Sequence, residues 1–416
     1  MKQILSIKII LIFSFLYFFF NKSVIGENTE IQIKIYTGSR DFAEYSAEVI
    51  ADLFDMSQSK LPVKPMQDYS GKMQQVYKIK PGYKALIYRN IRDLYSYSIK
   101  EWKIALANNW LLKDIGGQLV RSKQYPENYA VDIGNPDYQK WLAKILKGWL
   151  DEYTFFDGIF ADNGINVFVD AWLWDYPKEK VINPRSGDAW KDEEILQAYL
   201  ALHKEIKNAI GSKLLICNGV FHGERFFRYY KNYKQIFSNS LFDGVLSEGV
   251  WQTWPSEQSW LASLKYLIWV EDNFLQMNTN RYFIPVINPS LSPNIPQEQL
   301  MLFGVASTLL GMKTDRILIG GLLWSHKADK ESEMKELSFL RKLRQVKMGK
   351  ALNDYYLIQG TRVYTRDFIY GKVIVNPAPT NYSISLDKAY YTLEGNALSE
   401  IILNKHEGVI LFHKPR

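Results

Sequence analysis

Two strand-like segments of the chain share one pattern, and each ends in a carboxylic acid. Residues 156–162 and 242–248 both read as an aromatic residue, Asp-Gly, two apolar residues, a small residue and an acid. The acids are Asp162 and Glu248. An apolar run is typical of a buried parallel strand, and barrel enzymes hold catalytic groups at the carboxyl ends of such strands. The repeated pattern therefore predicts two carboxyl groups on one face of a barrel.

Paired carboxyl groups are what glycoside hydrolysis requires. One attacks or activates water, while the other protonates the leaving oxygen. The apolar side chains of Trp251 and Trp254 would raise the pKa of Glu248, which makes it the expected proton donor. The amide of Asn163 would favour ionisation of Asp162, the expected nucleophile or base. The alternative is that both acids only cap the helices that follow.

Polar or aromatic side chains also end most of the other predicted strands. A face that binds a sugar through many hydrogen bonds needs such residues, although loops are polar in most proteins. The candidate substrate-binding residues are Tyr88, Arg89, Asn90, Asp132, Asn163, Asn218, Trp251, Trp254, Asn288 and Trp324. Trp251 and Trp254 are the best candidates for stacking on a sugar ring, with packing in the core as an equal alternative.

The elements that must position these residues alternate regularly. Apolar strand-like runs and amphipathic helical segments follow one another about eight times, each cycle as long as a βα unit. We therefore expect an α/β fold, a single (β/α)8 TIM barrel, in residues 27–345. The strands that end at Asp162 and Glu248 are expected to be its fourth and sixth, with 129–132 among the earlier strands. Residues 47–54 fit either a helix or the first strand.

The pattern changes near residue 350. Short runs rich in β-forming residues follow at 362–364, 372–375, 382–386 and 408–412, separated by turn residues and without a helical period. This spacing predicts a small antiparallel β-domain, most simply a β-sandwich, in residues 350–416.

The first residues have the pattern of an export signal. Lys2 and Lys8 flank the start of an apolar run at 9–20, which is followed by polar and then compact residues. We expect residues 1–26 to be a signal peptide, so that the protein is secreted or held in the cell envelope. An uncleaved anchor is the alternative, although the run is short for a spanning helix.

Composition excludes several other classes of function. The net charge of +7 is spread along the chain, without the basic stripe of a nucleic-acid-binding protein. Five histidines without paired spacing give no metal site, and phosphate-loop and Gly-x-Ser-x-Gly patterns are missing, so no cofactor is expected. The single cysteine, Cys217, lies in an apolar run and predicts a buried, inert thiol.

Four segments resemble those of a known family. They are 88–90, 131–136, 157–163 and the strand that ends at Glu248, and they are similar to hypothetical glycosyl hydrolase family fifteen. Its members are glycoside-hydrolase-like (β/α)8 barrels, distantly similar to the endo-α-1,4-polygalactosaminidases. The resemblance covers about residues 45–345 and implies a glycosidase with Asp162 as nucleophile or base.

A carbohydrate substrate is therefore the expected partner. The rival hypothesis is a non-catalytic carbohydrate-binding protein on a glycosidase-like barrel. The sequence favours the enzyme because both candidate acids are present, and a barrel that had lost its activity would often lack one of them. The sequence leaves the sugar, its linkage and the oligomeric state open.

Overall fold

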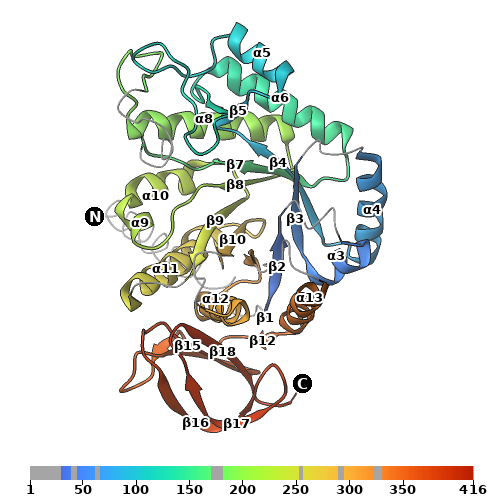
Figure 1. The fold of residues 1–416 in the computed structure, drawn as a ribbon, viewed down its shortest axis with the longest axis vertical. Coiled ribbons are helices and arrows are strands. Elements are labelled where there is room, and N and C mark those ends of the chain that lie inside the picture. The colour runs from blue at the N-terminus through green and yellow to red at the C-terminus, as the bar shows by residue number, and fades with distance from the viewer. Residues whose placement is uncertain are drawn as a thin grey trace, which may run out of the picture.

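A computed structural model of the chain describes residues 30–38, 45–60, 66–169, 181–252, 256–288, 295–321 and 330–415. The main body is a barrel of parallel strands surrounded by helices (Figure 1). Eight strands pair in the order β10-β9-β8-β7-β4-β3-β2-β11. Parallel bridges from β10 to the segment around β11 join the two ends of this order. The structure thus confirms the predicted TIM barrel.

The strands of the barrel are β2 (Lys34–Thr37), β3 (Met56–Lys60), β4 (Lys84–Asn90), β7 (Gly158–Asp162), β8 (Leu214–Asn218), β9 (Gly244–Trp251), β10 (Tyr282–Ile287) and β11 (Leu318–Ile319). The surrounding helices are α3 (Ala47–Leu53), α4 (Met66–Ile79), α5 (Ile99–Ala107), α6 (Pro136–Glu152), α8 (Asp192–Ile210), α9 (Gly223–Arg228), α10 (Tyr230–Asn239), α11 (Glu257–Val270) with the π-helix η2 (Glu271–Leu275), α12 (Gln297–Gly311) and α13 (Lys330–Arg344).

The interior of the barrel is filled by one apolar side chain from each strand. These residues form a single buried cluster: Tyr36, Met56, Leu86, Phe160, Ile216, Leu246, Ile284 and Leu318. Because side chains alternate along a strand, the residue two positions further on points to the same side. Asp162, Asn218 and Glu248 each stand two positions after a member of this cluster. The barrel therefore directs all three toward its carboxyl-end opening.

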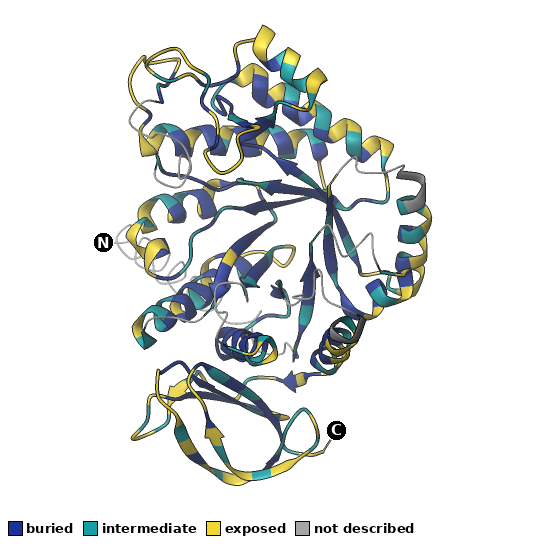
Figure 2. Cartoon of the chain, in the orientation of Figure 1, coloured by how far each residue is buried: buried dark blue, intermediate teal, exposed yellow. Residues whose placement is uncertain are grey.

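The helices cover the outside of the barrel with their apolar faces, as Figure 2 shows by the buried residues on their inner sides. Helix α6 illustrates the local cause. Asn135 caps it by accepting hydrogen bonds from the backbone N–H groups of Asp137 and Tyr138, and Pro136 occupies the first turn, where no N–H is needed. Its apolar residues then recur at helical spacing on the buried side. Helix α6 is one of the amphipathic helices expected to alternate with the strands.

Aspartates connect neighbouring barrel strands at their amino-terminal ends. The backbone N–H of Asp157 donates to the carbonyl of Ala85, and its carboxylate accepts the N–H of Ala85 in return at 2.9 Å. Asp243 makes the same exchange with Leu215 at 2.8 Å. A Cβ at Gly158 would lie 2.1 Å from a carbonyl oxygen of the next strand, which explains the glycine. The shared Asp-Gly pair is thus a strand-to-strand clamp at the end opposite the acids.

The structure corrects the assignment of the early strands. Segment 129–132 is not part of the barrel, because β6 (Asn128–Ala130) pairs antiparallel with β5 (Asp93–Tyr95) in a separate two-stranded sheet. Residues 47–53 are helix α3, and β2 and β3 are the first two strands. The expected positions of β7 and β9, fourth and sixth in chain order, are nevertheless confirmed.

The C-terminal part is a separate six-stranded antiparallel sheet in the order β13-β14-β15-β18-β16-β17. Its strands are β13 (Tyr356–Leu357), β14 (Tyr364–Phe368), β15 (Gly371–Asn376), β16 (Tyr382–Tyr391), β17 (Ala397–Leu403) and β18 (Glu407–Phe412). An apolar cluster that includes Ile374, Ile384 and Leu403 lies between its two halves, as in a sandwich. This sheet packs next to α12 (Figure 1). A short pair, β1 (Ile31–Gln32) and β12 (Lys347–Gly349), lies between the two parts.

Within the described residues, no helix has the length and apolar character needed to cross a membrane.

Candidate functional site

Asp162 and Glu248 meet across one amide at the carboxyl-end opening of the barrel. The side-chain nitrogen Nδ2 of Asn218 donates to Asp162 Oδ1 at 2.9 Å and to Glu248 Oε1 at 2.8 Å. Both bonds start at the same atom, so the two accepting oxygens lie no more than about 5.7 Å apart. The three residues come from β7, β8 and β9, which are neighbours in the sheet. The structure thus brings together the two acids that the sequence singles out.

Asp162 is held by two further donors. The hydroxyl of Tyr88 donates to Oδ2 at 2.5 Å, and the backbone N–H of Asn163 donates to Oδ1 at 2.9 Å. The Tyr88 ring stacks on Phe160 at a centroid distance of 6.1 Å, and the Lys60 ammonium lies 4.6 Å from its centroid. Desolvation, reinforced by the charge of Asp162, holds the pKa of Tyr88 well above its usual range. Tyr88 is therefore a neutral donor that fixes the carboxylate.

Glu248 has different surroundings. Solvent reaches its side chain at the opening, yet protein atoms crowd the carboxyl group from the barrel side. This desolvation raises the pKa of Glu248; the Asn218 hydrogen bond opposes the rise, and the charge of Asp162 adds to it. The raised pKa agrees with the expected direction, but the cause is not the side chain of Trp251, which points away from the site.

Asn163 builds the turn after β7. Asn163 has a φ of 54°, a left-handed conformation that asparagine tolerates better than most residues. Its side-chain oxygen accepts from Asn166 Nδ2 at 3.2 Å, and its carbonyl accepts from the Tyr199 hydroxyl at 2.7 Å. Asn163 thus aims its N–H at Asp162, while its side chain is engaged within the loop.

A buried histidine that sequence reasoning missed supports the same turn. His203 Nε2 lies 2.8 Å from the carbonyl oxygen of Gly164, and Nδ1 lies 2.6 Å from Ser240 Oγ. Desolvation lowers the pKa of His203 to about 4, so the ring is neutral near pH 7. The sequence signal that could have identified His203 is its place on the apolar face of α8, one turn after Tyr199. Cys217 lies beside it, and desolvation raises the pKa of this buried thiol, as expected for an inert cysteine.

Arg89 and Asn90 do not line the site. Arg89 follows Tyr88 by one position, so it points out of the barrel, where it forms an ion pair with Glu101 of α5 at 2.9 Å. The side-chain nitrogen of Asn90 donates to Asp93, and its oxygen accepts two backbone N–H groups of the same loop. Both side chains are thus buried and contact groups of the protein, and their sugar-binding roles stay predictions.

The side chains of Asp132 and Trp251 also form hydrogen bonds with other residues of the protein. Asp132 lies beyond β6, outside the barrel, and accepts two hydrogen bonds from Arg185 at 2.7 and 2.6 Å. Trp251 is fully buried, and its ring nitrogen donates to Thr308 on α12 at 2.7 Å. The structure thus supports the packing alternative for Trp251 and contradicts a stacking role.

The structure gives less information on the remaining predicted substrate-binding residues, Asn288, Trp254 and Trp324. Asn288 lies half-buried directly after β10, and its backbone N–H donates to the carbonyl of Trp251, so its role in binding stays a prediction. Trp254 and Trp324 lie outside the described residues. The described part of the chain holds no group of three or more His, Cys, Asp and Glu side chains placed to bind a metal ion.

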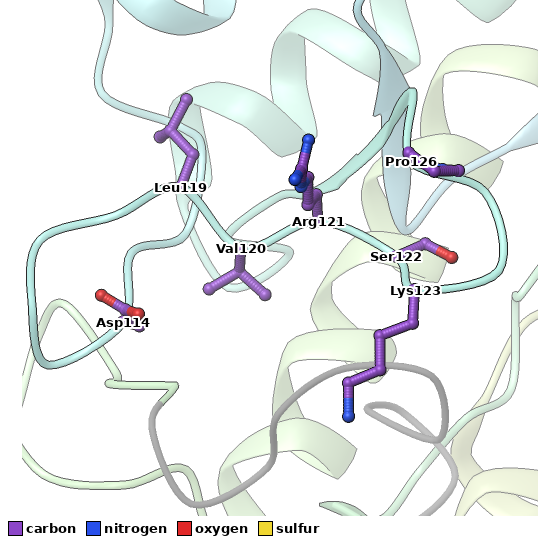
Figure 3. A pocket seen from close by; sticks show the side chains of 7 residues that line it. All are labelled: Asp114, Leu119, Val120, Arg121, Ser122, Lys123 and Pro126. Atoms are coloured by element: carbon purple, nitrogen blue, oxygen red, sulfur yellow. The ribbon is translucent and has the colours of Figure 1, made fainter.

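A separate pocket of about 370 Å³ lies on the excursion between β5 and β6 (Figure 3). Its lining residues lie along one loop, with Asp114 opposite: Asp114, Leu119, Val120, Arg121, Ser122, Lys123 and Pro126. None of them belongs to a barrel strand, and Asp114 already accepts the backbone N–H groups of Gly116 and Gln118. This pocket is therefore distinct from the paired carboxyl groups.

Comparison with known proteins agrees with this geometry. The sequence profile of hypothetical glycosyl hydrolase family 15 matches residues 77–372, more than half of the chain. The fold is similar to that of the Nostoc punctiforme debranching enzyme in an acarbose-soaked crystal, with a TM-score of 0.51 and 10% identity over 93% of this chain and 100% of that one. It is also similar to a mutant pullulanase from Paenibacillus barengoltzii in complex with maltotriose, with a TM-score of 0.53 and 10% identity over 94% and 80% of the two chains. At such identity these structures show the fold alone. No curated protein matches the sequence.

Proposed function

The chain belongs to hypothetical glycosyl hydrolase family 15, and we propose that it is an exported glycoside hydrolase that cleaves a polysaccharide or oligosaccharide with two carboxyl groups. The observation that carries the proposal is the Asn218 amide, which binds Asp162 and Glu248 at once. This amide keeps two acids of unlike surroundings at a fixed separation in the opening of the barrel.

The separation favours a retaining mechanism. Retaining enzymes hold their carboxyl groups about 5–5.5 Å apart, whereas inverting enzymes need about 6.5–9.5 Å to admit a water molecule. The upper limit of about 5.7 Å between the bonded oxygens fits the first class. In the first step, Asp162 attacks the anomeric carbon while Glu248 protonates the leaving oxygen, and the glycosidic bond breaks. In the second, the Glu248 carboxylate takes a proton from water, whose oxygen displaces Asp162 from the sugar.

Tyr88 and Asn218 would assist both steps. Each donates a hydrogen bond to Asp162, so each can stabilise the negative charge that returns to this carboxylate when the sugar leaves. Asn218 also holds Glu248 in place for proton transfer.

The pH dependence of the reaction tests the role of Asn218. Glu248 must be protonated to act as the acid, so kcat/KM should fall as the pH rises through its pKa. The Asn218 hydrogen bond lowers this pKa. Asn218→Ala should therefore move the alkaline limb of the profile to higher pH while reducing the maximum rate. Asn239→Ala, a change at an exposed helix end, should leave the limb where it is. A limb that moves downward in Asn218→Ala would contradict the assignment of Glu248 as acid.

The activity itself is tested on a panel of polymers. Reducing ends and product masses would be followed with pullulan, dextran, glycogen, chitosan and polygalactosamine as substrates. The debranching enzyme and the pullulanase make pullulan and glycogen natural first choices, and the family resemblance adds polygalactosamine. Binding to one of these polymers without any product would favour the rival hypothesis, a carbohydrate-binding protein on an inactive barrel.

Export is proposed from the first 26 residues. The basic start and the apolar run predict cleavage, so that the mature chain begins near Glu27. N-terminal sequencing of protein recovered from the medium or envelope should find this start. Protein that retains Met1 and stays with the membrane fraction would instead support an uncleaved anchor.

A further inference from the structure

A pair of tyrosine rings adjoins Tyr88, the residue that donates to Asp162. Tyr95 and Tyr97 stack with a centroid distance of 5.0 Å and an interplanar angle of 6°. Tyr95 lies within hydrogen-bonding reach of Tyr88, whose hydroxyl donates to Asp162. The outer ring, Tyr97, remains 66% exposed. A continuous series of contacts thus leads from Asp162 through Tyr88 and Tyr95 to a flat aromatic surface in solvent.

The backbone beneath the pair is well fixed. Tyr95 ends β5, which pairs with β6, and the N–H of Ser96 donates to the carbonyl of Glu127. The N–H of Ser98 closes a turn on the carbonyl of Tyr95. The strand itself begins at Asp93, which is buried and forms an ion pair with Arg92. The exposed ring is therefore held in place by ordered structure at the edge of the site and does not project from a free loop.

The exposed ring of Tyr97 leaves apolar surface in water, which is unfavourable in free energy. Single exposed apolar residues are common and need no explanation. Tyr97 differs because one of its faces is covered by the parallel ring of Tyr95, which itself adjoins Tyr88, while the Tyr97 side chain as a whole stays 66% exposed. A pyranose ring presents an apolar face of C–H groups that covers such a surface, and its hydroxyl groups can stay in water.

We propose that Tyr97, supported by Tyr95, is a subsite that stacks against a sugar unit of the substrate on the Tyr88 side of the paired carboxyl groups. The proposal rests on the proposed glycosidase function and adds a substrate-binding residue to it. It also identifies β5 and β6, the sheet outside the barrel, as a wall of the substrate cleft.

Affinity electrophoresis separates this subsite from catalysis. Asp162→Asn, which should bind substrate without cleaving it, would be run in native gels that contain pullulan, dextran, glycogen, chitosan or polygalactosamine. Adding Tyr97→Ala should weaken the retardation by the bound polymer about tenfold, and Tyr97→Phe, which keeps the ring, should restore it. Tyr370→Ala, at an exposed ring in the turn between β14 and β15, should have no effect. In the active enzyme, Tyr97→Ala should raise KM and leave kcat largely unchanged.

The outcomes distinguish the two proposals. If the Tyr97→Ala variant is retarded as strongly as its parent, the subsite is refuted while the glycosidase function stands. If Tyr97→Phe binds as weakly as Tyr97→Ala, the hydroxyl group and not the ring makes the contact, and stacking is refuted. If no polymer retards Asp162→Asn and none is cleaved by the unmodified protein, the proposed function fails and the subsite fails with it.

Discussion

Asp162→Asn should lower the turnover of a competent substrate by at least about a thousandfold, because an amide can neither attack the anomeric carbon nor carry the returning charge. The fold should survive, since the asparagine oxygen can still accept the hydrogen bonds from Asn218 and the Asn163 backbone, while its NH2 group can donate to the Tyr88 hydroxyl oxygen. Initial rates on the polymer that the unmodified protein cleaves, together with the thermal unfolding curve, would measure both effects.

Glu248→Gln should cause a loss of similar size through a different route. The amide cannot transfer a proton, and general acid catalysis typically contributes about a hundredfold to ten-thousandfold. The loss should be smaller with substrates whose leaving group needs no protonation, such as a dinitrophenyl glycoside, whereas Asp162→Asn should stay inactive on them. If either variant retained near-normal rates on the polymer, that residue would lose its role and the two-carboxylate mechanism would fail.

NMR analysis of the first-formed anomer would test retention directly.

The second large effect is expected in the contact between the barrel and the C-terminal sheet. Arg366 of β14 is buried and donates to the carbonyl groups of Leu309, Leu310 and Met312 at the end of α12, at 3.3, 3.0 and 2.7 Å. Desolvation lowers the pKa of Arg366. The three carbonyl groups replace the hydrogen bonds to water that the guanidinium loses on burial. Helix ends carry carbonyl groups without intrahelical partners, and here one arginine satisfies several of them.

Arg366→Met should therefore lower the free energy of unfolding by about 3 kcal/mol, since each buried group left without a partner costs about 1–3 kcal/mol. Urea unfolding monitored by tryptophan fluorescence would measure the loss. Arg341→Met is the matched control, because the ion pair of Arg341 with Asp52 is exposed and should contribute less than about 1 kcal/mol. Equal, small losses in both variants would show that the C-terminal sheet does not depend on this arginine for its position on α12.

Much of the fold could be predicted from the sequence because parallel strands that are buried on both faces consist of consecutive apolar residues. The strands β7, β8, β9 and β10 all have this character, and each was expected. Strand β3 was not, because its residues Met-Ser-Gln-Ser-Lys are mostly polar, and only its position between neighbouring strands buries Ser57 and Ser59. In contrast, segment 129–132 has strand-forming residues but pairs outside the barrel, a choice that depends on the path of the whole excursion.

The pairing of Asp162 with Glu248 was determined by the sequence alone, because strand alternation and the repeated pattern place both acids at the same end and on the same side of the barrel wall. Which of the other polar residues reach that site was decided by the tertiary structure. Asn218 joins the acids because β8 lies between their strands, whereas Arg185 engages Asp132 and Thr308 engages Trp251. A polar side chain is available to a ligand only when no group of the protein satisfies it first, and those groups come from segments far away in the chain.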